Sequence, residues 1–237
     1  MLHKTLPLIL LALGMLLQTS PVPLRAYLLG PDGLSTASIR AGNVPIGPLE
    51  RADLDRDGSP ESLALAAGHL EILSAGKPVW QSPADWNVVQ AAITDLNQDG
   101  LPEAALLVWR PFRAWPVDQW LPHGGRIAGF QDAAGNSCQI ILIGWRGNGY
   151  GEVWAGSALA EPVRSFGTAD LNGDGLQELV TLEGSYTDPP SAAAHALKVW
   201  QWNGFGFSNV STVRASVNKM VLVRADSGQI MILVTSQ

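Results

Sequence analysis

Three short stretches of the chain carry acidic and amide side chains at one shared spacing, which is the spacing of a metal-binding loop. Each stretch has an oxygen-bearing side chain at its positions 1, 3, 5 and 9 and a glycine at its position 6. The stretches are residues 53–61 (DLDRDGSPE), 95–103 (DLNQDGLPE) and 170–178 (DLNGDGLQE). Ca²⁺ takes about six to eight oxygen ligands, and the glycine permits a sharp turn that aims the carbonyl of position 7 inward. The pattern therefore predicts Ca²⁺-binding loops.

The residues after each loop exclude the helix-loop-helix class of calcium site. That class needs a bidentate glutamate at position 12, where this chain has Ala64, Leu106 and Thr181. Each loop is instead followed by a short apolar run, and such runs are typical of buried strands. The runs before the second and third loops are also strand-like. Each loop is therefore expected to join two strands of a hairpin.

An apolar strand, the pattern D-L-[DN]-x-D-G-x-x-E and a second apolar strand together resemble the FG-GAP repeat of integrin α-chain β-propellers and the similar, VCBS-like repeats of secreted bacterial proteins. Glutamate at position 9 departs from the aspartate often found there in the family. The absence of clear Phe-Gly and Gly-Ala-Pro signatures weakens the match to integrins more than the match to the bacterial relatives. The resemblance implies that the side chains of positions 1, 3, 5 and 9 and the carbonyl of position 7 hold Ca²⁺. The implied ligands are Asp53, Asp55, Asp57, Ser59 and Glu61 in the first loop, Asp95, Asn97, Asp99, Leu101 and Glu103 in the second, and Asp170, Asn172, Asp174, Leu176 and Glu178 in the third.

The spacing of the loops predicts a repeat array. The first two loops start 42 residues apart, at 53 and 95, and the third starts 75 residues later, at 170. A four-stranded propeller blade takes about 40 residues. We therefore expect a degenerate repeat, without the full acidic pattern, near Asp132 and another near Asp226. Two aromatic-flanked Asn-Gly turns, at 148–149 and 203–204, support duplication. The sequence thus predicts a β-propeller-like array of about five short antiparallel units, either an incomplete ring or a small closed one.

Composition favours one all-β domain over residues 27–237. The chain has 237 residues, of which 46% are hydrophobic and 15% charged, and this is enough for one sizeable core. Its 25 glycines and 16 prolines favour short strands and turns over long helices, and only residues 191–196 suggest a short helix or a loop. A net charge of −6 without a basic patch argues against nucleic acid and anionic membrane surfaces as partners.

Residues 1–26 resemble a signal peptide. A short basic start precedes an apolar run from Leu6 to Leu17, which is too short to span a bilayer. Cleavage is expected after Ser20 or Ala26, with an uncleaved anchor as the alternative. The expected location is extracytoplasmic: secreted, periplasmic or cell-surface. The single cysteine, Cys138, has no partner for a disulfide within the chain and is expected to be buried.

The sequence contains no nucleophile elbow and no His or Cys pair at zinc-ligand spacing. We therefore expect an exported, calcium-binding, non-catalytic module for binding, adhesion or scaffolding, with a protein or polysaccharide as its ligand. The alternative is a carbohydrate-active hydrolase or glycan-binding protein that uses the Trp-rich loop 109–120, with Asp118 and Glu183 as the carboxylates that the loops do not explain. A third possibility is an envelope protein with a purely structural role. Trp80, Trp154 and Trp200 are expected to pack within the repeats.

Overall fold

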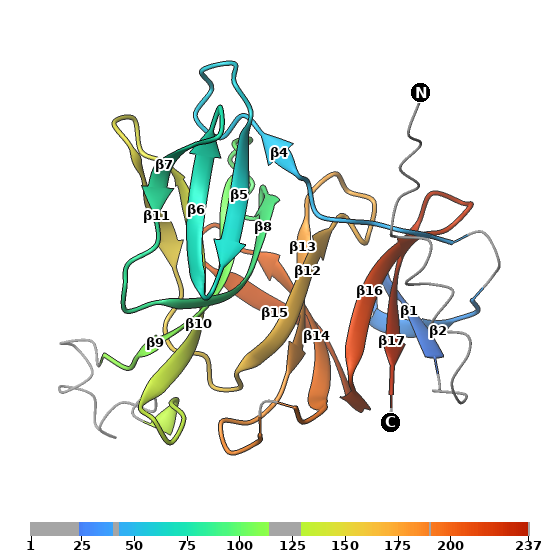
Figure 1. The fold of residues 1–237 in the computed structure, drawn as a ribbon. Helices are drawn as coiled ribbons and strands as arrows, with labels where there is room; N and C mark the ends of the chain where they lie inside the picture. Colours follow the sequence, from blue (N-terminus) through green and yellow to red (C-terminus); the bar gives the residue numbers. More distant parts are fainter. Residues whose placement is uncertain (1–23, 40–42, 114–128, 190, 237) are drawn as a thin grey trace, which may run out of the picture.

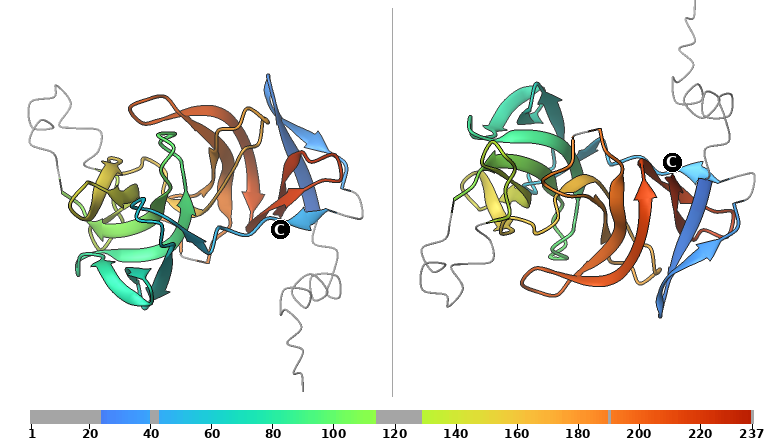
Figure 2. Two further views of the ribbon diagram at one scale, coloured as in Figure 1. Left: turned by 90° about the horizontal axis from the view of Figure 1, so that it is seen from above. Right: turned by 90° about the horizontal axis from the view of Figure 1, so that it is seen from below.

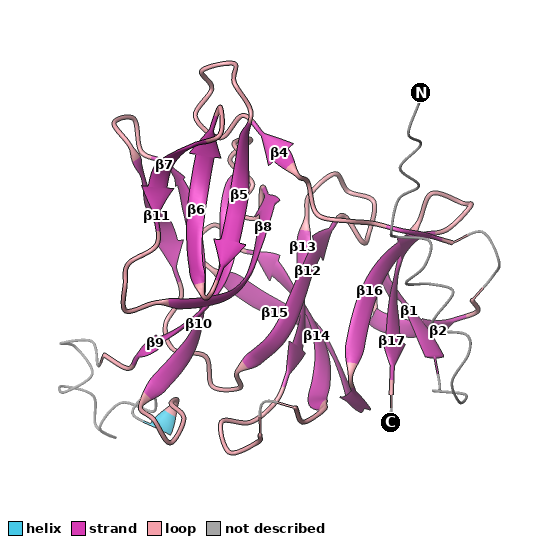
Figure 3. Cartoon of the chain, in the orientation of Figure 1, coloured by secondary structure: helices cyan, strands magenta, loops and turns pink. Residues whose placement is uncertain are grey.

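The computed structural model describes residues 24–39, 43–113, 129–189 and 191–236. The protein is all-β, with four antiparallel sheets arranged in a propeller-like ring (Figures 1 and 2). The described residues form strands, turns and a single short helical turn, without an α-helix (Figure 3). None of their elements is a helix with the length and apolar character that a bilayer crossing requires.

Three of the sheets, or blades, are built from four consecutive strands each. The first blade contains β4 (Arg51–Ala52), β5 (Glu61–Ala66), β6 (His69–Ser74) and β7 (Lys77–Gln81). The second contains β8 (Asn87–Thr94), β9 (Glu103–Pro111), β10 (Asn136–Trp145) and β11 (Tyr150–Ala155). The third contains β12 (Val163–Ala169), β13 (Glu178–Glu183), β14 (Ala194–Trp202) and β15 (Phe207–Val217).

The fourth sheet, the closing blade, joins the two ends of the described chain. Its strand order is β2-β1-β17-β16-β3, from β1 (Leu24–Gly30), β2 (Gly33–Ala37), β3 (Val44–Pro45), β16 (Lys219–Arg224) and β17 (Ile230–Thr235). β1 pairs with β17 in a register that places Tyr27 opposite Ile232. Both side chains are buried among residues of the third and closing blades. The first strand of the described chain therefore completes a blade that the last strands begin. β1 also crosses the expected domain boundary at residue 26.

The structure corrects the expected number of units from five to four. The degenerate repeat predicted near Asp132 is instead a turn between β9 and β10, inside the second blade. Asp132 accepts hydrogen bonds there from the backbone N–H groups of Ala134 (2.9 Å) and Asn136 (2.8 Å). The long connection from β9 to β10 explains the 75-residue spacing without an extra blade. The unit predicted near Asp226 corresponds to the β16–β17 hairpin of the closing blade.

The two predicted Asn-Gly turns join the third and fourth strands of their blades, as duplication requires. Their alignment is shifted from the expected one, because the turns run from Arg146 to Gly149 and from Asn203 to Gly206. The flanking aromatic pairs are Trp145 with Tyr150 and Trp202 with Phe207. Residues 194–196, part of the segment considered for a short helix, belong to β14 instead.

Three of the gaps between neighbouring blades are each filled by a separate apolar cluster, and each cluster includes the leucine at position 2 of one acidic loop. Leu54 lies between the first and second blades, Leu96 between the second and third, and Leu171 between the third and closing blades. These side chains are at most 1% exposed. Trp80, Trp154 and Trp200 pack against these clusters, and Cys138 is fully buried, as expected. Burial raises the pKa of the Cys138 thiol to about 12, which makes it unreactive.

The pairing of β1 with β17 predicts that β1 contributes strongly to the free energy of unfolding. Tyr27→Ala removes an aromatic ring that is only 4% exposed, so we expect it to lower the free energy of unfolding by about 3 to 5 kcal/mol. Leu24→Ala, in the same strand at a side chain 47% exposed, should cost about 0.5 kcal/mol or less. Urea denaturation measures both. Equal effects would show that β1 does not complete the ring in solution.

Candidate metal-binding loops

The three acidic loops occupy the same place in three successive blades. They connect β4 to β5, β8 to β9 and β12 to β13, which are the first and second strands of each blade. The strand-loop-strand prediction is therefore confirmed at all three positions. The fourth such connection, from β16 to β17, is the short turn 225–229, which lacks the acidic pattern. Figure 1 shows the first loop near its upper edge, above β5, and the third loop lower down, at the upper ends of β12 and β13.

Within each loop, the acidic side chains hold the backbone in its turn. The backbone N–H of position 6 donates to the Asp of position 1, at 3.0, 3.1 and 2.9 Å in the three loops. The N–H of position 5 donates to position 3, at 3.1, 3.1 and 2.9 Å. The N–H of position 7 donates to the Asp of position 5, at 2.7, 2.8 and 2.8 Å. The side chains of positions 1, 3 and 5 thus lie in one compact turn in each of the three blades.

The glutamate at position 9 is the most buried of the predicted ligand residues in each loop. Glu61, Glu103 and Glu178 are at most 1% exposed, and each begins the second strand of its blade. One carboxylate oxygen of each accepts the backbone N–H of the leucine at position 2, at 2.9, 3.0 and 2.7 Å. The glutamate side chain thus reaches back across the loop to the backbone of position 2.

Burial of the glutamates in the second and third loops disfavours their charged form. Burial is the largest effect on Glu103, and the nearby Asp95 and Asp99 add to it, so its pKa rises to about 8. Burial also raises the pKa of Glu178, for the same reason. Carboxylates held this way gain free energy when a cation approaches them.

Several buried oxygens of the first two loops have no hydrogen-bond partner. They are Asp53 Oδ1 and Glu61 Oε1 in the first loop and Glu103 Oε2 in the second. In the first loop, one ligand oxygen from each of Asp53, Asp55 and Glu61 lies within 4.8 Å of the others. An unpaired buried carboxylate oxygen is costly. The donor set and its unpaired oxygens thus fit a hard divalent cation.

Solvent exposure of the acidic side chains increases from the base of each loop to its tip. The position-1 aspartates Asp53, Asp95 and Asp170 are half-buried, and the position-5 aspartates Asp57, Asp99 and Asp174 are exposed. In the second and third loops, the side-chain amide of the asparagine at position 3 donates to the position-5 aspartate, at 3.1 and 2.9 Å. The first loop has Asp55 at position 3 and therefore presents more negative charge.

The left-handed backbone conformation at position 4 of each loop was not predicted from the sequence. Arg56, Gln98 and Gly173 have φ angles of 61°, 60° and 81°, in the left-handed region that glycine tolerates best. The only signal in the sequence is the glycine at this position in the third loop. Position 6, which was predicted, has φ angles of 87°, 80° and 88° at Gly58, Gly100 and Gly175.

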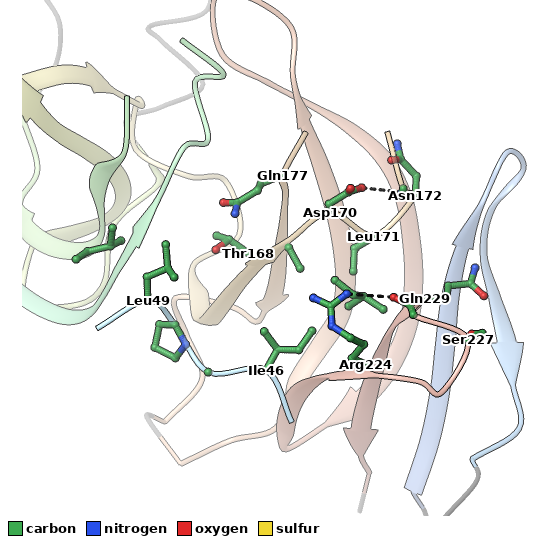
Figure 4. A pocket seen from close by; sticks show the side chains of 17 residues that line it. Ile46, Leu49, Thr168, Asp170, Leu171, Asn172, Gln177, Arg224, Ser227 and Gln229 are labelled. Carbon is green, nitrogen blue, oxygen red and sulfur yellow. Dashed lines mark hydrogen bonds between the residues drawn. The ribbon is translucent and has the colours of Figure 1, made fainter. Parts of the chain in front are cut away.

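The third loop also lines a cavity of about 560 Å³ that the sequence did not reveal (Figure 4). Asp170 and Asn172 of the loop line it, together with Thr168 of β12, Gln177 and, from the closing blade, Arg224. Arg224 donates a hydrogen bond to the carbonyl of Gly228 (3.1 Å). Four separate segments of the chain meet here, which is why no local motif marks the cavity.

A second polar cluster lies between the second and third blades. Lys198 Nζ lies 2.6 Å from Glu161 and 2.7 Å from Glu183. Burial alone lowers the pKa of Lys198, but its hydrogen bonds with the two glutamates outweigh burial and raise it. These three side chains line a cavity of about 490 Å³ together with Trp154, Trp200 and Phe207, among others.

Of the two carboxylates that the loops do not explain, the structure describes only Glu183. Glu183 is 4% exposed and also accepts hydrogen bonds from Thr181 Oγ1 (2.7 Å) and Trp200 Nε1 (3.1 Å). These hydrogen bonds and the ion pair with Lys198 give Glu183 a structural role. Asp118 lies outside the described residues.

Part of the Trp-rich loop also lies outside the described residues, including Trp115 and Trp120. The described part packs against its own blade and the third: Trp109 meets Tyr186 edge to face at 5.7 Å, and Arg110 lies over the Trp86 ring at 5.2 Å. Arg113 pairs with Asp85 at 2.8 Å.

No protein-family model matches the chain, and no curated protein matches it. The likeness to FG-GAP and VCBS-like repeats therefore rests on the loop residues themselves.

The loop backbone predicts the effect of a single added methyl group. A Cβ at Gly100 would meet nothing within 4 Å, so Gly100→Ala tests the φ of 80° alone. We expect it to lower the free energy of unfolding by about 1 to 2 kcal/mol. Gly47→Ala is the control, because a Cβ there also meets nothing and the φ lies outside the left-handed region. Chemical denaturation without metal measures both, and equal effects would contradict the turn geometry.

Proposed function

We propose that this chain is an exported calcium-binding protein with FG-GAP-like repeats, acting as a non-catalytic module for binding, adhesion or scaffolding. The observation that carries the proposal is the first loop, where Asp53, Asp55 and Glu61 gather their oxygens and two buried oxygens lack a partner. The same loop pattern recurs at the equivalent connection of two further blades.

The donor chemistry favours Ca²⁺ over other ions. All the side-chain donors are carboxylate or amide oxygens, which suit hard cations, whereas zinc and copper sites use imidazole or thiolate. Mg²⁺ demands a small octahedral site and keeps several waters, and an irregular loop with long glutamates is better matched to Ca²⁺. A bound ion would supply positive charge to the acidic turn. The residues themselves fix the loop backbone and offer their second oxygens.

The sites favour a structural role for the ion. Each loop carboxylate accepts a backbone N–H, so the loop carboxylates help to hold the turn in its conformation. Ions in three loops would stiffen the same connection in three blades and so shape a surface for a protein or polysaccharide ligand. An extracytoplasmic location fits, because modules of this kind fill at about 10⁻⁴ to 10⁻³ M Ca²⁺. Of the two expected cleavage points, the one after Ser20 leaves β1 whole.

A second candidate, glycan binding, is favoured by the cavity around Lys198. It combines the aromatic rings of Trp154, Trp200 and Phe207 with the charged groups of Glu161, Lys198 and Arg214. Aromatic faces stack on the apolar side of a sugar ring, and the charged groups offer donors and acceptors for its hydroxyls. This surface would serve binding without hydrolysis, because Glu183 is buried in its ion pair.

Metal removal tests the main proposal. We expect Ca²⁺ at millimolar concentration to raise the melting temperature by several degrees over EGTA, because an ion that binds only the folded form stabilises it. Mg²⁺ should have a much smaller effect. Differential scanning calorimetry at constant ionic strength measures the shift. Identical melting in Ca²⁺ and EGTA would contradict the proposal.

Single substitutions count the sites. Asp57→Ala, Asp99→Ala and Asp174→Ala should each reduce the number of bound Ca²⁺ ions by one, as measured by isothermal titration calorimetry. Asp132→Ala is the matched control, since Asp132 also caps backbone N–H groups in a turn but lies outside the three loops. A loss of ions in the Asp132 variant would mean that the loops are not the sites.

The glycan candidate has its own test. Arg214→Ala removes an exposed charge from the cavity around Lys198, so it should abolish binding to any glycan found on an array without changing the melting temperature. Arg51→Ala, an exposed arginine in the first blade, serves as control. Unchanged glycan binding in the Arg214 variant would place the ligand elsewhere.

A further inference from the structure

The hydroxyl of Tyr150 is buried and has no hydrogen-bond partner. Buried tyrosine hydroxyls nearly always find a partner, so an exception calls for a physical explanation. The other unpartnered oxygens of this kind in the described residues include Asp53 Oδ1 and Glu61 Oε1 of the first acidic loop. Glu61 is 0% exposed, so its free oxygen has no access to solvent.

The Tyr150 ring is held in the gap between two blades. Tyr150 is the first residue of β11 in the second blade, and it pairs across the hairpin with Trp145. The two rings meet edge to face, with centroids 5.2 Å apart. Tyr150 also packs against the apolar cluster that contains Leu54, the position-2 leucine of the first loop. Its position is therefore set by contacts from both blades.

The hydroxyl faces the acidic side chains of the first loop. Burial is the main cause that raises the pKa of Tyr150, and the negative charges of Glu61 and Asp55 raise it further. Asp55 and Glu61 also raise this pKa as hydrogen-bond acceptors of the hydroxyl, although neither contact reaches full hydrogen-bond geometry and the buried hydroxyl is left without a partner. Oxygens from two blades converge without satisfying one another, and a cation among them would satisfy all.

We propose that the hydroxyl oxygen of Tyr150 is a further ligand of the first loop's Ca²⁺ site, so that the ion clamps the first blade to the second. The proposal rests on calcium binding by the loops, as proposed above. Tyr150 would hold the ion with Asp53, Asp55 and Glu61. Unlike them, it comes from a different sheet. Filling this site would stabilise the gap between two blades as well as one turn.

The third blade provides an internal comparison. Its β14–β15 hairpin carries Trp202 and Phe207 at the places of Trp145 and Tyr150. Phe207 packs against the cluster that contains Leu96 of the second loop, as Tyr150 packs against the cluster with Leu54. Phenylalanine has no hydroxyl to offer. The second loop therefore lacks the extra oxygen. The first site should bind Ca²⁺ more tightly than the second.

Calcium titration calorimetry of the full chain tests the proposal with a double-mutant cycle. Tyr150→Phe should weaken one Ca²⁺ site by about tenfold or more and leave the melting temperature in EGTA unchanged or slightly raised. In the Asp57→Ala background, Tyr150→Phe should have no further effect on the remaining sites, because the two residues serve the same ion. Phe207→Tyr, the reciprocal variant, should strengthen the second site.

The outcomes separate the two proposals. If the unsubstituted protein binds no Ca²⁺, the proposed function fails and the role of Tyr150 fails with it. If it binds Ca²⁺ and Tyr150→Phe leaves every affinity unchanged, only the role of Tyr150 is overturned. A loss of affinity that persists in the Asp57→Ala background would also overturn it, because the hydroxyl would then act on another site.

Discussion

The fold depends on one repeated interaction, a buried glutamate that accepts the backbone N–H of a buried leucine across each acidic loop. Leu54, Leu96 and Leu171 fill the gaps between blades, and Glu61, Glu103 and Glu178 begin the second strand of their blades. The hydrogen bond between them, 2.7 to 3.0 Å long, fixes where the first strand ends and the second begins. The same bond places a carboxylate at the base of the loop, where its charge needs a partner.

This arrangement links metal binding to the packing between blades. The leucine next to the first ligand position belongs to an inter-blade cluster, so an ion that orders the loop also orders that cluster. In the first loop the link is closer, because Tyr150 of the second blade packs against the apolar cluster that contains Leu54 of the loop. The closing blade has no such loop, and there the ring is held by the pairing of β1 with β17. Two different interactions therefore connect the blades: apolar packing beside the three acidic loops, and the pairing of β1 with β17 in the closing blade.

Local patterns predicted the features that depend on local physics. The loop spacing, the strands on either side, the all-β class and the burial of Cys138 follow from residue type and periodicity, and the structure confirms them. The blade number was wrong because spacing alone cannot distinguish a long connection such as the one after β9 from a missing unit. The left-handed conformation at Arg56 and Gln98, the two cavities and the place of Tyr150 depend on tertiary contacts. Tyr150 appears in the sequence only as a turn-flanking aromatic, and nothing local indicates which loop it faces.

The central claim is that the acidic loops of the folded protein hold calcium, and counting the ions tests it most directly. Equilibrium dialysis of the purified protein against millimolar Ca²⁺, followed by elemental analysis of protein and dialysate, gives the number bound per chain. The account predicts three ions per chain, one for each loop pattern in the sequence. No bound calcium would contradict it and would leave the loops as turns braced by their own carboxylates.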